Sequence, residues 1–209
     1  MRIGIIGSGN IGSTAAKLFV EAGHEVAIAN SRGPESLREE VAGLGDRAQA
    51  ATPEDAAAFG EVVLVAIPFG RYRDLPAGAL AGRIVIDANN YYPERDGQIP
   101  ELDSGETTSS ELAAAHLPGA RLVKAFNTMY YERLRDEGRP RGEQRLAIFV
   151  AGDDVGAKAV VSGLIDEVGF EAVDVGSLAD GRRQQPGTET YDKPLTADEA
   201  RRALEASGG

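Results

Sequence analysis

Short apolar runs recur along the chain and alternate with segments of helical character. The runs are rich in Val, Ile and Leu and lack polar alternation, which is typical of strands buried on both faces of a parallel sheet. They span residues 2–7, 25–30, 61–67, 83–88, 120–126, 145–150 and 170–175, and helical segments fit between most of them, at 11–22, 34–42, 52–59, 109–116 and 155–168. This order predicts an α/β fold with a doubly wound, mostly parallel sheet.

The last part of the chain has a different composition. After Val175 the sequence is polar and rich in turn residues, up to a terminal helix for which T-A-D-E, beginning at Thr196, resembles a capping box. With 209 residues, 42% of them hydrophobic, the chain can bury one large core or two small ones. We therefore expect a sheet domain over residues 1–178 and a small C-terminal extension over 179–209, not a second full domain.

Composition argues against several classes of function. No apolar run approaches the length of a membrane span, and the opening MRIGIIGSGN turns glycine-rich too early for a secretory leader, so we expect a cytoplasmic location. The chain has no cysteine and only two, well-separated histidines, which argues against a metal centre. A net charge of -11 argues against nucleic-acid binding, because the phosphate backbone would repel such a surface. The expected partner is a small molecule, without a nucleic acid or a membrane.

A glycine-rich hexapeptide, GSGNIG, directly follows the first apolar run. In a G-x-G-x-x-G motif the first glycine allows a tight turn, the second lets the backbone approach a pyrophosphate, and the third lets the helix pack closely on the strand. Here the motif opens a helix that leads to a second apolar run. This context predicts a Rossmann-type domain that binds a dinucleotide through Gly7, Ser8, Gly9, Asn10, Ile11 and Gly12. A glycine-rich turn without a ligand is the alternative.

The second apolar run ends in NSRGPESL, residues 30–37, where NAD enzymes usually carry an acidic residue. Asn30 removes that charge, Ser31 can donate a hydrogen bond to a phosphate oxygen, and Arg32 can supply a fork of donors with a full positive charge. These three residues predict that the cofactor is NADP(H), with its 2′-phosphate at Ser31 and Arg32. A polar surface turn is the alternative.

Further candidates lie where later runs end, because ligands of such folds bind at the carboxyl ends of the strands. VAIPFG places Ala66, Ile67 and Pro68 beside the expected nicotinamide, and DANN places Asn89 there. VKAFNT adds Ala125, Asn127 and Thr128. We expect Pro68, Asn127 and Thr128 to form the hydride-transfer pocket. Turn chemistry and core packing explain several of these residues equally well.

No acid–base catalyst emerges from the sequence. His24 lies in a turn at the wrong edge of the sheet, His116 closes a helix, and Lys124 could point into packing or toward the cleft. Tyr91, Tyr92, Tyr130 and Tyr131 are possible proton donors without an identifiable partner. Hydride transfer between two redox rings needs little acid–base help, since binding and alignment supply most of the catalysis. Such a reaction fits this inventory, and no catalytic residue is assigned.

The motifs GSGNIG, NSRGPESL, VKAFNT and VAGDD follow one another over essentially the whole chain. In this respect the sequence resembles the predicted dinucleotide-binding enzymes related to the NADP reductases that use the deazaflavin coenzyme F420. It is also similar to the cytosolic NADPH-binding domain of the STEAP metalloreductases. The resemblance implies direct hydride exchange between NADP(H) and a deazaflavin or flavin, with the acceptor near Ile67, Pro68 and Asn127. It also implies a small C-terminal portion that closes the pocket. We also expect a homodimer.

Two departures from the family pattern leave the acceptor open. Deazaflavin reductases carry a glycine-threonine form of the phosphate loop, and a histidine where this chain has Asn127. The deazaflavin coenzyme also has an anionic tail, for which positive charge is available on one connection at Arg133, Arg135, Arg139, Arg141 and Arg145. A solvated arginine-rich loop is the alternative.

Two other functions remain open. One is an NADPH-dependent reductase of a small imine or carbonyl substrate, although such enzymes usually add a large helical domain. The other is a non-catalytic NADP-binding redox sensor. An open, aromatic-lined site of ring size beside the nicotinamide would favour hydride transfer to a ring, and a filled or occluded site would favour the sensor.

Overall fold

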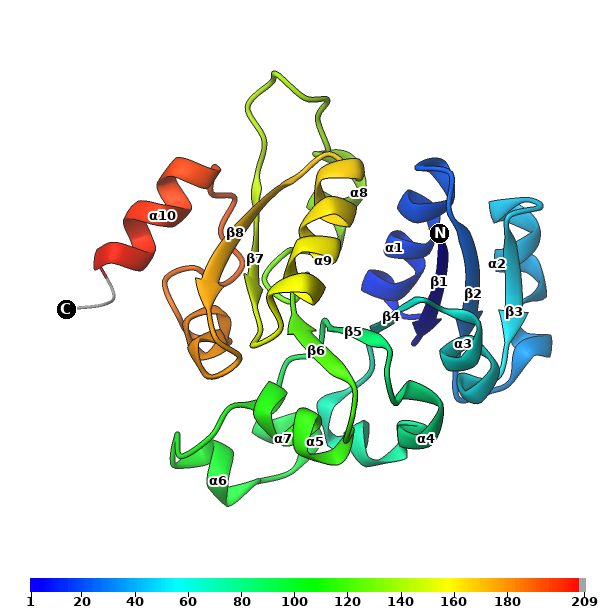
Figure 1. Cartoon of the computed structure of the whole chain (residues 1–209), viewed down its shortest axis with the longest axis horizontal. Helices are drawn as coiled ribbons and strands as arrows, with labels where there is room; N and C mark the ends of the chain where they lie inside the picture. The colour runs from blue at the N-terminus through cyan, green and yellow to red at the C-terminus, as the bar shows by residue number, and fades with distance from the viewer. Residues whose placement is uncertain (207–209) are drawn as a thin grey trace.

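The structure, a computed structural model, describes residues 1–206. Within these residues eight strands form one sheet in the order β3-β2-β1-β4-β5-β6-β7-β8 (Figure 1). The strands are β1 (Arg2–Ile6), β2 (Glu25–Ala29), β3 (Ala48–Ala51), β4 (Val62–Val65), β5 (Ile84–Asp87), β6 (Arg121–Lys124), β7 (Ala147–Ala151) and β8 (Glu171–Gly176).

The strand order reverses direction between β1 and β4. The chain first winds outward from β1 through β2 to β3, and then returns to the other side of β1 for β4, β5 and β6, all parallel to one another. Strand β7 is antiparallel to β6, and the two pair only where Lys124 faces Ala151. The doubly wound, mostly parallel sheet of Rossmann type predicted from the sequence is confirmed.

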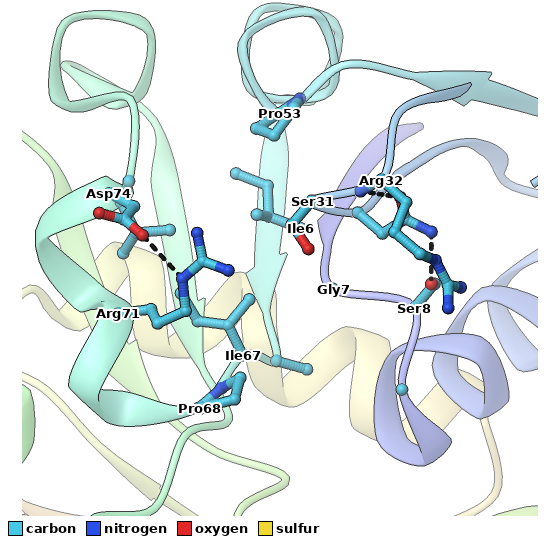
Figure 2. Close-up of a pocket in the computed structure, with 14 residues that line it drawn as sticks. Ile6, Gly7, Ser8, Ser31, Arg32, Pro53, Ile67, Pro68, Arg71 and Asp74 are labelled. Atoms are coloured by element: carbon cyan, nitrogen blue, oxygen red, sulfur yellow. Dashed lines mark hydrogen bonds and ion pairs between the residues drawn. The ribbon is translucent and has the colours of Figure 1, made fainter. Parts of the chain in front are cut away.

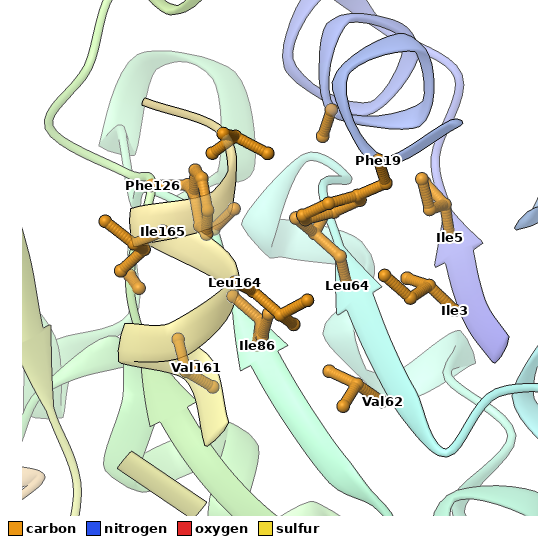
Figure 3. Packing of buried hydrophobic residues seen from close by; sticks show 14 of the residues in the cluster. Ile3, Ile5, Phe19, Val62, Leu64, Ile86, Phe126, Val161, Leu164 and Ile165 are labelled. Carbon is orange, nitrogen blue, oxygen red and sulfur yellow. The ribbon is translucent and has the colours of Figure 1, made fainter. Parts of the chain in front are cut away.

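Helices cover both faces of the sheet. On one face α1 (Asn10–Glu21) and α9 (Val155–Glu167) pack on β1, β4 and β5, and Figure 3 shows Phe19 and Leu164 meeting strand residues such as Leu64 and Ile86. On the other face lie α3 (Pro53–Phe59), α4 (Ala77–Leu80), α7 (Ser109–His116) and the 3₁₀ helix η2 (Phe69–Asp74). Two buried apolar cores therefore enclose the strands, as the runs without polar alternation indicated.

The remaining helices are short or terminal. They are η1 (Pro34–Leu37), α2 (Arg38–Leu44), α5 (Pro93–Asp96), α6 (Pro100–Asp103), α8 (Tyr131–Asp136), η3 (Ala179–Gln184) and α10 (Ala197–Ala206). Helix α10 packs on β7 and β8 through Ala200 and Leu204. Its predicted capping box is present, because Glu199 Oε2 accepts from Thr196 N at 2.9 Å and Thr196 Oγ1 accepts from Glu199 N at 3.4 Å. Residues 207–209 of the predicted extension lie outside the described residues.

Several elements differ from the prediction. Strand β3 has the sequence AQAA, which lacks the β-branched residues that identify strands, and it pairs with β2 at the edge of the sheet. The run 61–67 ends as a strand at Val65, because the Ile67 N–H donates to Asn89 Oδ1 at 2.8 Å instead of joining the ladder. The predicted helix 34–42 is a 3₁₀ turn followed by α2. Within residues 1–206, no helix is long and apolar enough to span a membrane.

Candidate functional site

The glycine-rich loop connects β1 to α1, and its three glycines serve different purposes. Gly7 has a positive φ of 116°, and a Cβ there would overlap the Ala66 carbonyl oxygen. Gly12 is buried on the first turn of α1, where a Cβ would overlap the Gly7 carbonyl oxygen. Gly9, by contrast, has nothing within 4 Å of a Cβ position. The loop therefore leaves open space at Gly9, where the G-x-G-x-x-G motif needs it for a ligand.

Asn30 connects the loop after β2 to the glycine-rich loop by hydrogen bonds. Its Nδ2 donates to Ser8 Oγ at 3.1 Å and to Ser36 Oγ at 3.0 Å, while its Oδ1 accepts from Arg32 N at 2.9 Å. Ser31 and Arg32 are exposed at the tip of this loop. Within residues 1–206 the Arg32 guanidinium has no ion-pair partner, so it is available to an anion from solution.

These two loops form one wall of a cavity of about 340 Å³, here called the loop pocket. Figure 2 shows Arg32, Ser31 and Ser8 on one side, and Arg71, Asp74, Ile67 and Pro68 on the other. The lining consists of Ile6, Gly7, Ser8, Gly9, Asn30, Ser31, Arg32, Pro53, Ala66, Ile67, Pro68, Arg71, Asp74 and Leu75. It lies at the carboxyl ends of β1, β2 and β4, across the point where the strand order reverses.

A second cavity of about 230 Å³, here called the tyrosine pocket, is lined in part by residues at the start of α1. Its floor includes Asn10 and Ile11, which directly follow Gly9 of the loop pocket. Its other lining residues come from the ends of β5 and β6 and from the C-terminal extension: Ala88, Asn90, Asn127, Thr128, Met129, Tyr130, Tyr131, Tyr191 and Asp192. The two pockets thus flank the glycine-rich loop along one edge of the sheet.

Asn127 is the centre of a polar network in the tyrosine pocket. Its Nδ2 donates to Asn90 Oδ1 at 3.0 Å and to the Gln184 carbonyl oxygen at 2.6 Å. Asn90 Nδ2 donates in return to the Asn127 carbonyl oxygen at 2.8 Å and to Tyr191 Oη at 3.2 Å. Among the described residues Asn127 Oδ1 is buried without a partner, an arrangement that is uncommon in proteins and that a ligand donor would relieve.

Tyr191 is half-buried and hydrogen-bonds through its hydroxyl group to the hydroxyl group of Tyr92. Burial, followed by this hydrogen bond, raises the pKa of Tyr191 above its ordinary value. The phenol therefore keeps its proton at neutral pH and is able to donate a hydrogen bond.

The backbone at the end of β6 is strained. Phe126 has a φ of 65°, in the left-handed region that non-glycine residues seldom adopt. Its ring is buried and packs edge-to-face on Phe19 at 6.3 Å between ring centroids. The packing of this ring anchors the turn at Phe126, after which Asn127 and Thr128 line the tyrosine pocket.

A buried ionic cluster lies at the carboxyl ends of β5 and β6. Lys124 is fully buried, and its Nζ donates to Asp87 Oδ2 at 3.3 Å and to the Asn89 carbonyl oxygen at 2.9 Å. Ser110 Oγ also donates to Asp87 Oδ2, at 2.6 Å. Lys124 thus points into packing and not into the cleft. Asn89, which the sequence placed at the cofactor, accepts from the Ile67 N–H through Oδ1 at 2.8 Å and lines neither pocket.

Other residues considered in the sequence have structural surroundings. Ala125 is fully buried in the core and lines neither pocket. His24 lies in the turn between α1 and β2, at the opposite end of α1 from the glycine-rich loop. Its Nε2 is 2.8 Å from Glu167 Oε2. Arginines of the arginine-rich connection form ion pairs, because Arg141 and Arg145 share the carboxylate of Asp166 and Arg135 pairs with Asp136. Arg133 is the member nearest the tyrosine pocket, where it pairs with Asp192.

The resemblance implied that a small C-terminal portion closes the pocket, but the residues through which the extension contributes were not found from the sequence. Gln184 Nε2 donates to the Lys124 carbonyl oxygen at 3.1 Å, and Asp192 N donates to the Thr128 carbonyl oxygen at 3.1 Å. These bonds place the extension over the carboxyl end of β6 of its own chain, with Tyr191 in the pocket wall. The turn-rich sequence carries no periodicity that could have shown this.

The chain matches known proteins along most of its length. Residues 2–91, which include the elements around the loop pocket, match the family model described as NADP oxidoreductase, coenzyme F420-dependent. The hypothetical protein SMa0349 from Sinorhizobium meliloti is 34% identical in sequence, with a TM-score of 0.81, and the likeness covers 94% of this chain and 95% of that one. A protein from Arthrobacter sp. FB24, provisionally described as an F420-dependent NADP reductase, is 30% identical, with a TM-score of 0.74 over 87% of each chain.

A relative with a larger architecture is metalloreductase STEAP3 from Rattus norvegicus, which is 32% identical over 184 residues. The match covers 87% of this chain and 35% of STEAP3, so the chain spans about a third of the length of that relative. These likenesses confirm the resemblance inferred from the motifs. The chain belongs to the coenzyme F420-dependent NADP oxidoreductase family, a family of NADP(H)-binding oxidoreductases.

Proposed function

We propose that the protein transfers hydride between NADP(H) and a planar ring acceptor, either a deazaflavin such as coenzyme F420 or a flavin. The observation that carries this proposal is the tyrosine pocket. It is open and lined by Tyr130, Tyr131 and Tyr191, and Asn10 and Ile11 of the glycine-rich motif also line it. A flat aromatic ring fits such walls, because aromatic side chains offer stacking surfaces at little cost in conformational entropy.

The cofactor would extend across both pockets. Its pyrophosphate would lie over Gly7 to Gly12 at the N-terminus of α1, where backbone N–H groups and the helix dipole favour an anion. Its 2′-phosphate would lie at Ser31 and Arg32 in the loop pocket. Its nicotinamide would reach the tyrosine pocket, with Ile67 and Pro68 at the junction. There the carboxamide would lie beside Asn127 and Thr128 of the pocket lining.

In this arrangement the chain contributes alignment more than acid–base chemistry. NADPH supplies the hydride, and the acceptor ring receives it. The tyrosine pocket would hold the acceptor against the nicotinamide, and the protonated Tyr191 hydroxyl would donate a hydrogen bond to a polar atom of the acceptor. Tyr191 and Asp192 of the extension would form one wall of this pocket. The homodimer and the cytoplasmic location expected from the sequence stay predictions.

The direct test is NADPH oxidation by the purified protein, followed by absorbance with coenzyme F420, FMN, FAD, a cyclic imine or no acceptor. We expect turnover with at least one ring acceptor and none with the imine. Turnover with the imine alone would replace the proposal by imine reduction. Tight NADPH binding without turnover on any acceptor would favour the redox sensor.

Arg32→Ala tests the assignment of the 2′-phosphate. We expect it to weaken NADPH binding by one to two orders of magnitude, roughly 1.5 to 3 kcal/mol for a charge-assisted contact, and to leave NADH binding nearly unchanged. Fluorescence titration with both cofactors measures this. The matched control is Arg38→Ala, which removes an exposed guanidinium paired with Glu35 outside the loop pocket. Equal losses for NADPH and NADH would show that Arg32 does not recognise the 2′-phosphate.

A further inference from the structure

Arg71 and Asp74 face the loop pocket from the wall opposite Arg32 (Figure 2). Both belong to η2, the 3₁₀ helix that follows β4, and Arg71 Nε donates to Asp74 Oδ2 at 2.7 Å. The side chains are 57% and 60% exposed, so the pair is solvated, and exposed pairs of this kind contribute little to stability. A stronger anion can therefore displace Asp74 from Arg71.

The backbone that carries Arg71 is fixed. Phe69 is fully buried and stacks on the nearly buried Tyr72, with 4.8 Å between ring centroids. Arg71 N also donates to the Pro68 carbonyl oxygen at 3.0 Å. Because Phe69 and Tyr72 fix the buried side of η2, the backbone does not need to move. A rotamer change of the exposed Arg71 side chain is enough to replace Asp74 by another anion as its acceptor.

We propose that Arg71 is a second phosphate-binding residue of the loop pocket and that Asp74 competes with the cofactor for it. This inference rests on the proposed function for the identity of the ligand. The phosphate in question is the pyrophosphate of NADP(H). Arg32 and Ser31 line the pocket on the β2 side, where the 2′-phosphate would lie, whereas Arg71 lines it on the β4 side of the glycine-rich loop, over which the pyrophosphate would lie. When the cofactor is bound, the Arg71 guanidinium leaves the Asp74 carboxylate and donates to the pyrophosphate oxygens.

The two partners have opposite expected effects on binding. Arg71→Gln removes the donor, and we expect it to weaken both NADPH and NADH binding about tenfold, as for loss of a charge-assisted hydrogen bond. Asp74→Asn frees Arg71, and we expect it to tighten the binding of both cofactors about threefold. In the double variant the effect of Asp74→Asn should largely disappear, because its benefit passes through Arg71.

The experiment is a fluorescence titration of wild type, both single variants and the double variant with NADPH and with NADH. Arg73→Gln is the matched control, because Arg73 lies on the same helix but stacks on the Tyr72 ring at 5.2 Å and does not line the pocket. Thermal melts without cofactor should be alike for all variants, since the substituted side chains are exposed.

Three results would overturn the role of Arg71, and a fourth would overturn the role of Asp74. They are unchanged affinities for Arg71→Gln, a loss for NADPH alone, which would move Arg71 to the 2′-phosphate, and an equal loss for Arg73→Gln. An Asp74→Asn gain that persists in the double variant would likewise show that Asp74 acts only through its own charge. The proposed function fails separately: a wild type that binds cofactor but reduces no ring acceptor contradicts it while leaving these affinities, and the role of Arg71, intact.

Discussion

Gly12→Ala is expected to prevent the chain from folding stably, whereas Gly9→Ala is expected to leave the fold intact and to remove tight cofactor binding. The Cβ of an alanine at position 12 would overlap the Gly7 carbonyl oxygen, a backbone atom with no freedom to move aside. Helix α1 would have to move away from β1. This would disturb the core in which Phe19 of α1 and Ile5 of β1 are packed. We expect a loss of about 3 kcal/mol or more in the free energy of unfolding, at or above the upper end for overpacked sites.

At Gly9 the expectation is reversed. A Cβ there meets no atom within 4 Å, and the backbone φ of -80° suits any residue, so the stability cost is at most about 1 kcal/mol for a less favourable N-cap. The added methyl group would occupy the space through which the pyrophosphate approaches the backbone. We expect NADPH and NADH to bind at least about tenfold more weakly, equivalent to about 1.4 kcal/mol.

Urea denaturation and cofactor titration on the same preparations separate the two effects. A Gly12→Ala variant with wild-type stability would mean that α1 tolerates a shift relative to β1. Unchanged cofactor affinity in Gly9→Ala would mean that the pyrophosphate does not lie over this glycine.

Lys124→Met has the second large expected effect, and it acts on stability. Lys124 is fully buried and neutralises Asp87, which is also buried. Removing only the cation leaves an uncompensated carboxylate in the core, and breaking a buried pair in this way costs about 3–5 kcal/mol. We expect a fall of that size in the free energy of unfolding, measured by urea denaturation.

Two further variants distinguish the cost of the unpaired buried charge from the cost of lost packing. Adding Asp87→Asn to Lys124→Met should recover more than half of the loss, because a neutral amide can still accept from Ser110 Oγ without carrying a charge. Lys17→Met is the control for the loss of an ordinary lysine, since Lys17 and its partner Glu21 are 57% and 58% exposed and such a pair is worth about 0–1 kcal/mol. If the double variant is no more stable than Lys124→Met, the cost arises from packing and not from the buried charge.

The parts of the fold that local sequence determines could be predicted. A buried parallel strand followed by a glycine-rich turn and a helix is a pattern within one short segment, and Gly7, Gly12 and Arg32 lie where that pattern puts them. Asn30 was predicted for the charge it removes, but its hydrogen bonds to Ser8 and Ser36 depend on the three-dimensional arrangement of two loops.

The tyrosine pocket could be predicted only in part, because the contacts that complete it are distant in sequence. Asn90 and Tyr191 are 101 residues apart, and Asn127 and Gln184 are 57 residues apart. No hydrophobic period connects such residues, and the segment that carries Tyr191 reads as turns. Strand β3 was missed for a different reason, since its alanines have no strand preference and only pairing with β2 makes them a strand.

The two pockets draw on different stretches of the chain. The residues that line the loop pocket all fall between positions 6 and 75, whereas apart from Asn10 and Ile11 the tyrosine pocket is built from positions 88 to 192. Mutations in the second stretch can therefore reshape the tyrosine pocket, the proposed acceptor site, without changing the residues proposed to hold the phosphates. Evolution could in this way exchange one electron acceptor for another while the same reductant is kept.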